Sequence, residues 1–184
     1  MSDAIEKRAG SELKAIDQLE RDDGDRSFRA AVPEGAVFVD LEIPFHDIDP
    51  LFVAWHGHYY KYLEIARTAL QRHHRLDAPD LRELGFAWFV IETRTRHVQA
   101  LHYGERFRVF SWFVEDDPRV GIAYEIRSLA TLEGEPTGHR VARARTVLVN
   151  TVLRVDGGPR EAGPRGELLF ATPAAIKERI GLDR

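Results

Sequence analysis

The chain of 184 residues contains no cysteine. That absence excludes disulfide bonds, thiolate zinc sites and cysteine nucleophiles. Positive charge is also scarce, with 26 Lys and Arg against 30 Asp and Glu, which gives a net charge of −4. Because nucleic acids are bound through basic surfaces, this balance argues against nucleic acid as an obligate partner.

Long hydrophobic runs are missing as well. The longest uncharged stretches, such as 86–91 and 146–153, fall far short of the roughly 20 residues that cross a bilayer as a helix. The N-terminal segment has no apolar core of the kind that a signal peptide needs. We therefore expect no membrane span and a cytoplasmic location. The hydrophobic share of 43% is still enough for a packed core, and the length fits one domain with an appendage.

Residues 1–35 differ from the rest of the chain. Apolar residues recur there at spacings of three to four, which gives one narrow stripe on a charged helix: Ile5, Ala9, Leu13, Ile16 and Leu19. The run 22–29 is charged, and Pro33 and Gly35 follow it. We predict a helical arm and linker over 1–35, which packs on the domain or on a partner, with disorder as the alternative. The single domain then covers 36–184.

After residue 35 the periodicity predicts a strand, a long helix and four further strands. Apolar residues alternate along 36–45, which indicates a strand. From Tyr59 to Leu70 they recur every three or four positions, which indicates a helix; Pro79 closes this segment, and a short turn follows over 81–85. β-Branched and aromatic residues between turn residues predict strands at 86–101, 105–115, 119–133 and 139–155.

The last part of the chain predicts a loop over 156–166 and a short helix from Pro173 to Ile180. One long apolar helix face and one curved antiparallel sheet can each bury the other. The order of elements therefore predicts the α+β class, with the sheet wrapped around the helix or with the helix on one face of it.

Ionisable residues gather around the predicted start of the long helix, between Pro44 and Glu64. A helix N-terminus offers unpaired N–H groups and a partial positive charge, which suit an oxyanion. Asp49 lies in the loop just upstream, seven residues before His56, so the loop can fold back toward the same place. Gly57 would let a ligand approach the backbone closely.

Each of these residues also has an ordinary structural explanation. Asp47 or Asp49 can accept from N–H groups of their own loop, and Asp49 followed by Pro50 is a turn signal. His56 or His58 can simply pack at the helix start. The same residue types could bind a metal, but histidines two positions apart on a helix point to different sides, so we expect no metal site.

Taken together, the segment resembles the signature of the hydroxybenzoyl-CoA thioesterase and Tol-Pal-associated acyl-CoA thioesterase family of hotdog proteins. That family has an aspartate–x–aspartate loop, a few mostly small residues, an aromatic residue, a histidine or tyrosine, and a helix with a Tyr-Leu/Phe-Glu-like run. The residues that match without a gap are Asp47, Ile48, Asp49, Pro50, Val53, Trp55, His56, Tyr59, Tyr62, Leu63 and Glu64. The later run from His102 to Val109 is similar too, and the resemblance covers about 37–155.

The resemblance implies a hotdog fold, in which a curved antiparallel sheet wraps around a long central helix. It also implies hydrolysis of an acyl-CoA or acyl-carrier-protein thioester without a cofactor, by a homodimer or homotetramer. By position, Asp49 corresponds to the catalytic aspartate, as nucleophile or as general base for water, and His56 to the residue at the head of the helix. The residues expected to contact the substrate are Trp55, Gly57, His58 and Tyr59. For the phosphates of coenzyme A, Arg119 loosely matches a basic position of the family, although an arginine at a strand end can also be simply solvated. The alternatives for this role are Arg94, Arg96, Arg140, Arg143 and Arg145.

Leu51 and Phe52 depart from the family pattern, in which glycine or alanine-glycine follows the aspartate. Bulk at these positions should reshape the acyl pocket or the loop, so the acyl group is the part of the function that the sequence determines least. The departure also keeps open a non-catalytic hotdog module that binds acyl groups or assembles partners. A hotdog hydratase or dehydratase would need a different, histidine-centred signature, which the sequence does not contain.

Overall fold

The residues from 32 onward form one compact unit, and the computed structural model describes residues 31–116, 119–152 and 171–181. Most of the arm predicted over 1–35 and all of the loop predicted over 156–166 lie outside these ranges. The elements follow the predicted order: β1 (Val37–Glu42), the 3-10 helices η2 (Phe45–Asp47) and η3 (His56–His58), α2 (Tyr59–His73), α3 (Ala78–Glu83), β2 (Phe86–His97), β3 (Arg106–Asp116), β4 (Arg119–Ala130), β5 (Arg140–Val152) and α4 (Ala174–Ile180).

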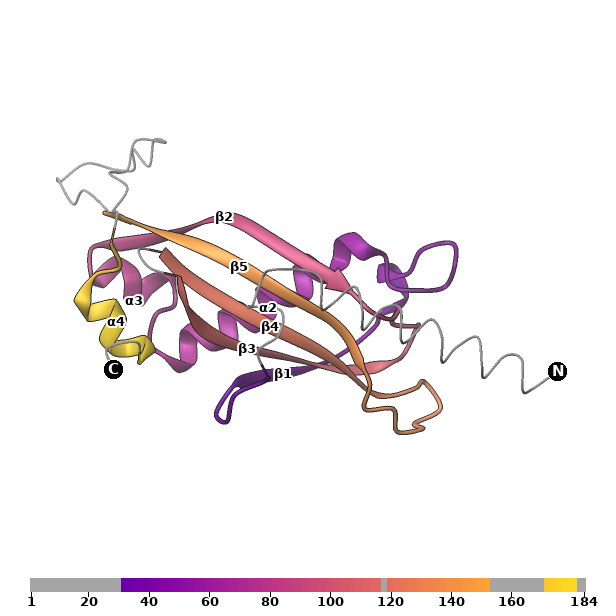
Figure 1. Cartoon of the computed structure of the whole chain (residues 1–184). Coiled ribbons are helices and arrows are strands. Elements are labelled where there is room, and N and C mark those ends of the chain that lie inside the picture. The colour runs from indigo at the N-terminus through magenta and orange to yellow at the C-terminus, as the bar shows by residue number, and fades with distance from the viewer. Residues whose placement is uncertain (1–30, 117–118, 153–170, 182–184) are drawn as a thin grey trace, which may run out of the picture. The chain divides into compact units, whose positions relative to one another are not determined.

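The five strands form one antiparallel sheet in the order β1-β3-β4-β5-β2. The sheet curves around α2, which runs along its inner face (Figure 1). β4 is the central strand, whereas β1 and β2 are the two edges. A curved antiparallel sheet around a long central helix is the hotdog arrangement, so the predicted α+β class and fold are confirmed.

The core lies between α2 and the inner face of the sheet. The helix buries one face, made of Tyr59, Tyr62, Leu63, Ala66 and Leu70. Because successive residues of a strand point to opposite faces, every second residue of the central strand belongs to the same core cluster: Val120, Ile122, Tyr124 and Ile126. The remaining side chains of α2 are exposed or half-buried, as expected of an amphipathic helix.

Pro79 does not close the segment after the long helix, contrary to the prediction. α2 ends at His73, and Asp77 begins the separate helix α3 through a capping box with Asp80. Pro79 lies in the first turn of α3, where a proline is tolerated because the first N–H groups of a helix have no partner. The turn predicted over 81–85 overlaps the second half of this helix.

Three strands end earlier than predicted. The strand predicted at 36–45 ends at Glu42, β2 ends at His97 instead of 101, and β4 ends at Ala130 instead of 133. In each case the apolar pattern continues past the last residue that has a partner strand. Periodicity reports which face a side chain prefers, but not where the neighbouring strand stops.

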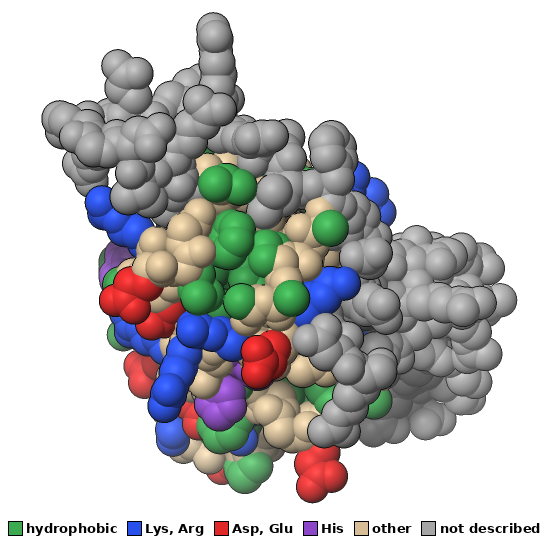
Figure 2. All heavy atoms as spheres, turned by 90° about the vertical axis from the view of Figure 1, so that its left-hand side faces the viewer, with side chains coloured by type: hydrophobic (Ala, Val, Ile, Leu, Met, Phe, Trp, Pro, Cys, Tyr) green, Lys and Arg blue, Asp and Glu red, His purple; other side chains and the backbone are tan. Residues whose placement is uncertain are grey.

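The end of the sheet far from the loop before α2 is closed by α3 and α4. α4 confirms the predicted terminal helix, and it places Ile176 and Ile180 in the core. Figure 2 views this end of the molecule and shows hydrophobic side chains gathered between groups of Lys and Arg. None of the helices described is long and apolar enough to cross a membrane.

Candidate active site

The loop between β1 and α2 folds back on itself as a small hairpin. Ile48 pairs with Ala54, and the Asp49 N–H donates to the Val53 carbonyl at 2.9 Å. At the tip, the Phe52 N–H donates to the Asp49 carbonyl, also at 2.9 Å. The hairpin therefore sets Asp49 beside the residues that lead directly into the helix.

Phe52 has a φ of 61°, in the left-handed region that bulky residues rarely adopt. Leu51 and Phe52 are the pair that stands against the glycine or alanine-glycine of the resembled family, and glycine takes up a left-handed conformation without strain. The side chains of Leu51 and Phe52 are 79% and 68% exposed. The bulky pair therefore occupies the turn with its side chains in solvent.

The carboxylate of Asp49 is half-buried, and one of its oxygens takes part in the turn. Oδ1 accepts from the Leu51 N–H at 2.8 Å, which is the ordinary turn role of aspartate. Within the ranges that the structure covers, no donor engages Oδ2. The structural and the functional explanations of Asp49 are therefore compatible, because each can use a different oxygen.

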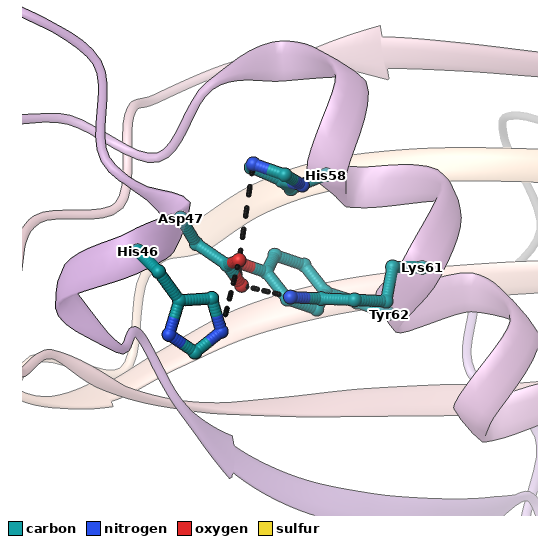
Figure 3. A network of polar contacts seen from close by, with 5 residues as sticks. All are labelled: His46, Asp47, His58, Lys61 and Tyr62. Atoms are coloured by element: carbon teal, nitrogen blue, oxygen red, sulfur yellow. Dashed lines mark hydrogen bonds and ion pairs between the residues drawn. The ribbon is translucent and has the colours of Figure 1, made fainter.

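Asp47, two residues earlier, has a fully buried side chain that the sequence did not single out as catalytic. Its Oδ2 accepts from the Tyr62 hydroxyl at 2.7 Å and from the Lys61 ammonium (Figure 3). Burial by itself would raise the pKa of this carboxyl, but the bonds from Lys61 and Tyr62 outweigh burial and hold the pKa below its usual range. Asp47 is therefore a buried carboxylate that stays charged.

At the helix start, the ring of Trp55 lies directly over Gly57. A Cβ placed on Gly57 would stand 2.1 Å from a carbon of this ring. The rings of His56 and His58 flank the indole, with centroids 5.1 and 5.3 Å from it. Gly57 has no left-handed φ, so the close approach of Trp55 is what requires a glycine. Trp55 thus fills the side of Gly57 on which a Cβ would stand.

The first N–H groups of this helical segment are not all engaged. The His58 N–H donates to the Trp55 carbonyl at 2.8 Å, and the Tyr59 N–H donates to the His56 carbonyl. For the N–H groups of His56 and Gly57, the described residues supply no acceptor. Two adjacent donors at a helix start form a site that can receive a negatively charged oxygen.

Tyr59 is buried, so it lies beneath the site and not at its surface. Only 2% of its surface is exposed, and burial raises the pKa of its hydroxyl to about 12. The ring of His97, at the end of β2, stands edge-on to Tyr59 with centroids 4.5 Å apart. Loss of hydration there, and then the neighbouring His56, lower the pKa of His97. His97 thus joins the histidines near the helix start, a placement that depends on the sheet and has no signal in the sequence.

Arg119 lies elsewhere. It lines a recess of about 120 Å³ together with Glu92, Arg94, Arg145 and Val147. These residues of β2 and β5 alternate with Thr93 and Thr146, which face the helix, so the recess is on the outer face of the sheet. The structure therefore brings the predicted residues from Asp49 to Tyr59 together, but places Arg119 apart from them.

The side chains around the helix start do not form a metal cage. No three His, Asp or Glu residues in the part of the chain that the structure describes are arranged to hold a metal ion. His46 and His58 instead approach the same oxygen of Asp47, at 3.5 and 3.8 Å from their Nε2 atoms.

Comparison with known proteins places this geometry in context. Residues 43–177 match the Thioesterase-like superfamily. YneP of Bacillus subtilis, which is named as an acyl-CoA thioesterase, is 27% identical to this chain over 77 residues. These residues are 42% of this chain and 55% of YneP. The chain thus spans about half the length of the curated relative that it matches.

Solved structures agree on the fold. A Staphylococcus aureus protein in complex with CoA superposes with a TM-score of 0.65 at 13% identity, over 83% of this chain and 86% of the other. A mutant of 4-hydroxybenzoyl-CoA thioesterase in complex with 4-hydroxybenzoyl-CoA superposes with a TM-score of 0.60 at 17% identity, over 79% of this chain and 98% of the other. These similarities confirm the hotdog fold.

The packing of Trp55 on Gly57 predicts a strong coupling between the two residues. Gly57→Ala should lower the free energy of unfolding by about 1–3 kcal/mol, because the new methyl group collides with the indole. In a Trp55→Ala background the same change should be nearly neutral, since the obstructing ring is gone. Urea unfolding of the four proteins of this double-mutant cycle measures the coupling. An equal penalty in both backgrounds would show that the ring does not require the glycine.

Proposed function

The chain belongs to the thioesterase-like superfamily, and from this membership and the geometry of the loop we propose that it hydrolyses an acyl- or aroyl-CoA thioester to the free acid and coenzyme A. One observation carries the proposal. Among the residues that the structure describes, one oxygen of the half-buried Asp49 carboxylate has no donor. The hairpin sets Asp49 just ahead of a helix start where two N–H groups have no acceptor in the same part of the chain. A carboxylate and an oxyanion site are the two parts that thioester hydrolysis needs.

In the proposed reaction, Asp49 attacks the thioester carbonyl directly, or takes a proton from the water that attacks it. The carbonyl oxygen becomes negative and is received by the N–H groups of His56 and Gly57. The C–S bond then breaks, and the thiolate of coenzyme A leaves and is protonated. When water is the attacking group, this step gives the free acid; when Asp49 attacks, it leaves an acyl-aspartyl anhydride, which a water molecule hydrolyses to the free acid and the Asp49 carboxylate. His56 is exposed at the edge of this site, where its ring can orient water or donate that proton.

Asp49→Asn tests the assignment. Asparagine keeps the Oδ1 acceptor for the Leu51 N–H, so the turn should persist, but the charge is lost. We expect kcat to fall by about 10²- to 10⁴-fold, the usual contribution of an acid–base group, while binding of acyl-CoA is retained. Release of free thiol from a panel of acyl- and aroyl-CoA thioesters measures turnover. Asp40→Asn, on the outer face of the sheet, is the matched control and should leave kcat unchanged.

Three results would change these proposals. Turnover by Asp49→Asn at a rate near that of the wild type would remove Asp49 from the reaction. His56→Ala should cost less than Asp49→Asn, and a larger loss would reverse the ranking of the two residues. Binding without turnover by the wild type, across the whole panel, would leave the non-catalytic acyl-binding module as the function.

We further propose that the recess around Arg119 receives phosphates of coenzyme A. Three arginines line it, and Arg94 is paired there with Glu92. Arg119→Ala should raise KM for an acyl-CoA by about tenfold, the loss of roughly one charge-assisted hydrogen bond. The matching N-acetylcysteamine thioester lacks the nucleotide, so its kinetics should not change. An equal effect on both substrates would contradict a phosphate-binding role.

We also propose that the protein forms a homodimer through the edge strand β2. Three consecutive apolar residues are exposed along it: Phe89 at 56%, Val90 at 45% and Ile91 at 49%. An open sheet edge with an apolar surface favours pairing with another chain, and a second copy offers the same edge. Ile91→Lys should shift the mass measured by light scattering from dimer to monomer. Phe38→Lys, on the opposite edge β1, should not; a monomeric wild type would overturn the proposal.

A further inference from the structure

Asp47 carries a buried charge that the proposed reaction does not use. Its side chain has no exposed surface, and a buried carboxylate is costly unless donors surround it. Only Oδ2 has such donors, the hydroxyl of Tyr62 and the ammonium of Lys61. A neutral side chain would avoid the free-energy cost of burying a charge. We therefore ask which parts of the structure this charged carboxylate holds in place.

The contacts of Asp47 join the two ends of the hairpin and the helix. Its carbonyl accepts from the Trp55 N–H at 2.9 Å, which closes the base of the hairpin. Its carboxylate reaches Lys61 and Tyr62, in the first turn of α2. Asp49 itself makes only bonds within the hairpin. Asp47 therefore links the hairpin that carries Asp49 to the first turn of α2, while the bonds of Val53 and Ala54 to His102 and Leu101 hold the other arm.

The surroundings of the second oxygen of Asp47 also connect the loop with the helix start. Oδ1 is buried and has no hydrogen-bond partner among the residues described. It stands 3.5 Å from Nε2 of His46, on the loop side, and 3.8 Å from Nε2 of His58, at the helix start (Figure 3). One carboxylate thus lies between side chains from η2, η3 and α2, the three segments that surround the site.

We propose that Asp47 is a positioning residue: its buried carboxylate fixes the hairpin that carries Asp49 against the N-terminus of α2. Asp47 does not touch the substrate and takes no part in the chemistry. Its effect on turnover rests on the proposed function, whereas its effect on the hairpin can be measured without any substrate.

The test compares Asp47→Asn with Tyr62→Phe and with Glu125→Gln. Tyr62→Phe removes one of the two donors to Oδ2 and keeps the ring in the core. Glu125→Gln is the matched control, since Glu125 is also fully buried and held by hydrogen bonds, from Arg127 and Arg143, but on the outer face of the sheet. Each variant is assayed for kcat and KM, and for hydrogen exchange of peptides covering residues 45–58.

We expect Asp47→Asn to lower kcat by about 10²-fold with KM little changed, because a small displacement of a reacting group reduces turnover without removing binding contacts. Exchange over 45–58 should accelerate in Asp47→Asn and, to a smaller extent, in Tyr62→Phe. The double variant Asp47→Asn/Tyr62→Phe should have nearly the same kcat and exchange as Asp47→Asn alone, since both changes weaken the same connection between Asp47 and α2. Glu125→Gln should alter neither kcat nor exchange in this segment.

Three results would overturn the proposal: unchanged kcat in Asp47→Asn, unchanged exchange over 45–58, or an equal loss of kcat in Glu125→Gln. If Asp47→Asn does not fold, kcat and the hydrogen exchange over 45–58 are compared in Tyr62→Phe instead, and no change in either would overturn the proposal. A wild type that hydrolyses no thioester in the panel would refute the proposed function, whereas the exchange data would still decide whether Asp47 anchors the hairpin.

Discussion

The burial of one face of α2 against the curved sheet is the contact on which both the core and the site depend. Tyr62 makes this dependence concrete. Its ring packs against Phe107 of β3, with centroids 5.0 Å apart, while its hydroxyl donates to Asp47 at the base of the hairpin. The same burial and hydrogen bond raise the pKa of Tyr62, so its hydroxyl stays a donor. The packing that sets the helix in the sheet therefore also sets the loop beside the helix.

The two aspartates of the loop have environments that suit different tasks. Asp47 is enclosed, charged and bonded to the helix, whereas Asp49 is half-buried and uses one oxygen in a local turn. A carboxylate neutralised by a nearby ammonium adds little negative charge to a site that is proposed to receive an oxyanion. A carboxylate with an unengaged oxygen can instead approach a carbonyl or a water molecule. Their separation by two residues on a folded hairpin makes this division of roles possible.

The outer face of the sheet follows a different constraint, because its register sets arginines opposite one another. Arg94 is paired with Arg145, and Arg96 with Arg143. Like charges directly across two strands destabilise a sheet unless acids lie between them. Glu125 supplies part of this compensation: burial alone would raise its pKa, but Arg127 and Arg143 outweigh burial and keep the carboxyl charged. The basic recess around Arg119 is thus a product of strand register.

By itself, the sequence determined the order of the elements, the buried face of α2 and the loop-and-helix segment that contains Asp49. These features are local: side-chain periodicity follows from the geometry of one helix or strand, and the motif is contiguous from Asp47 to Glu64. Only the tertiary structure decided that Trp55 covers Gly57, that Arg119 lies apart from the loop, and that His97 reaches the helix start. It also showed that the buried Asp47 bonds Lys61 and Tyr62 of α2 and the Trp55 N–H. These facts depend on strand register and on which side chains a folded hairpin encloses, and neither is encoded in the spacing of residues along the chain.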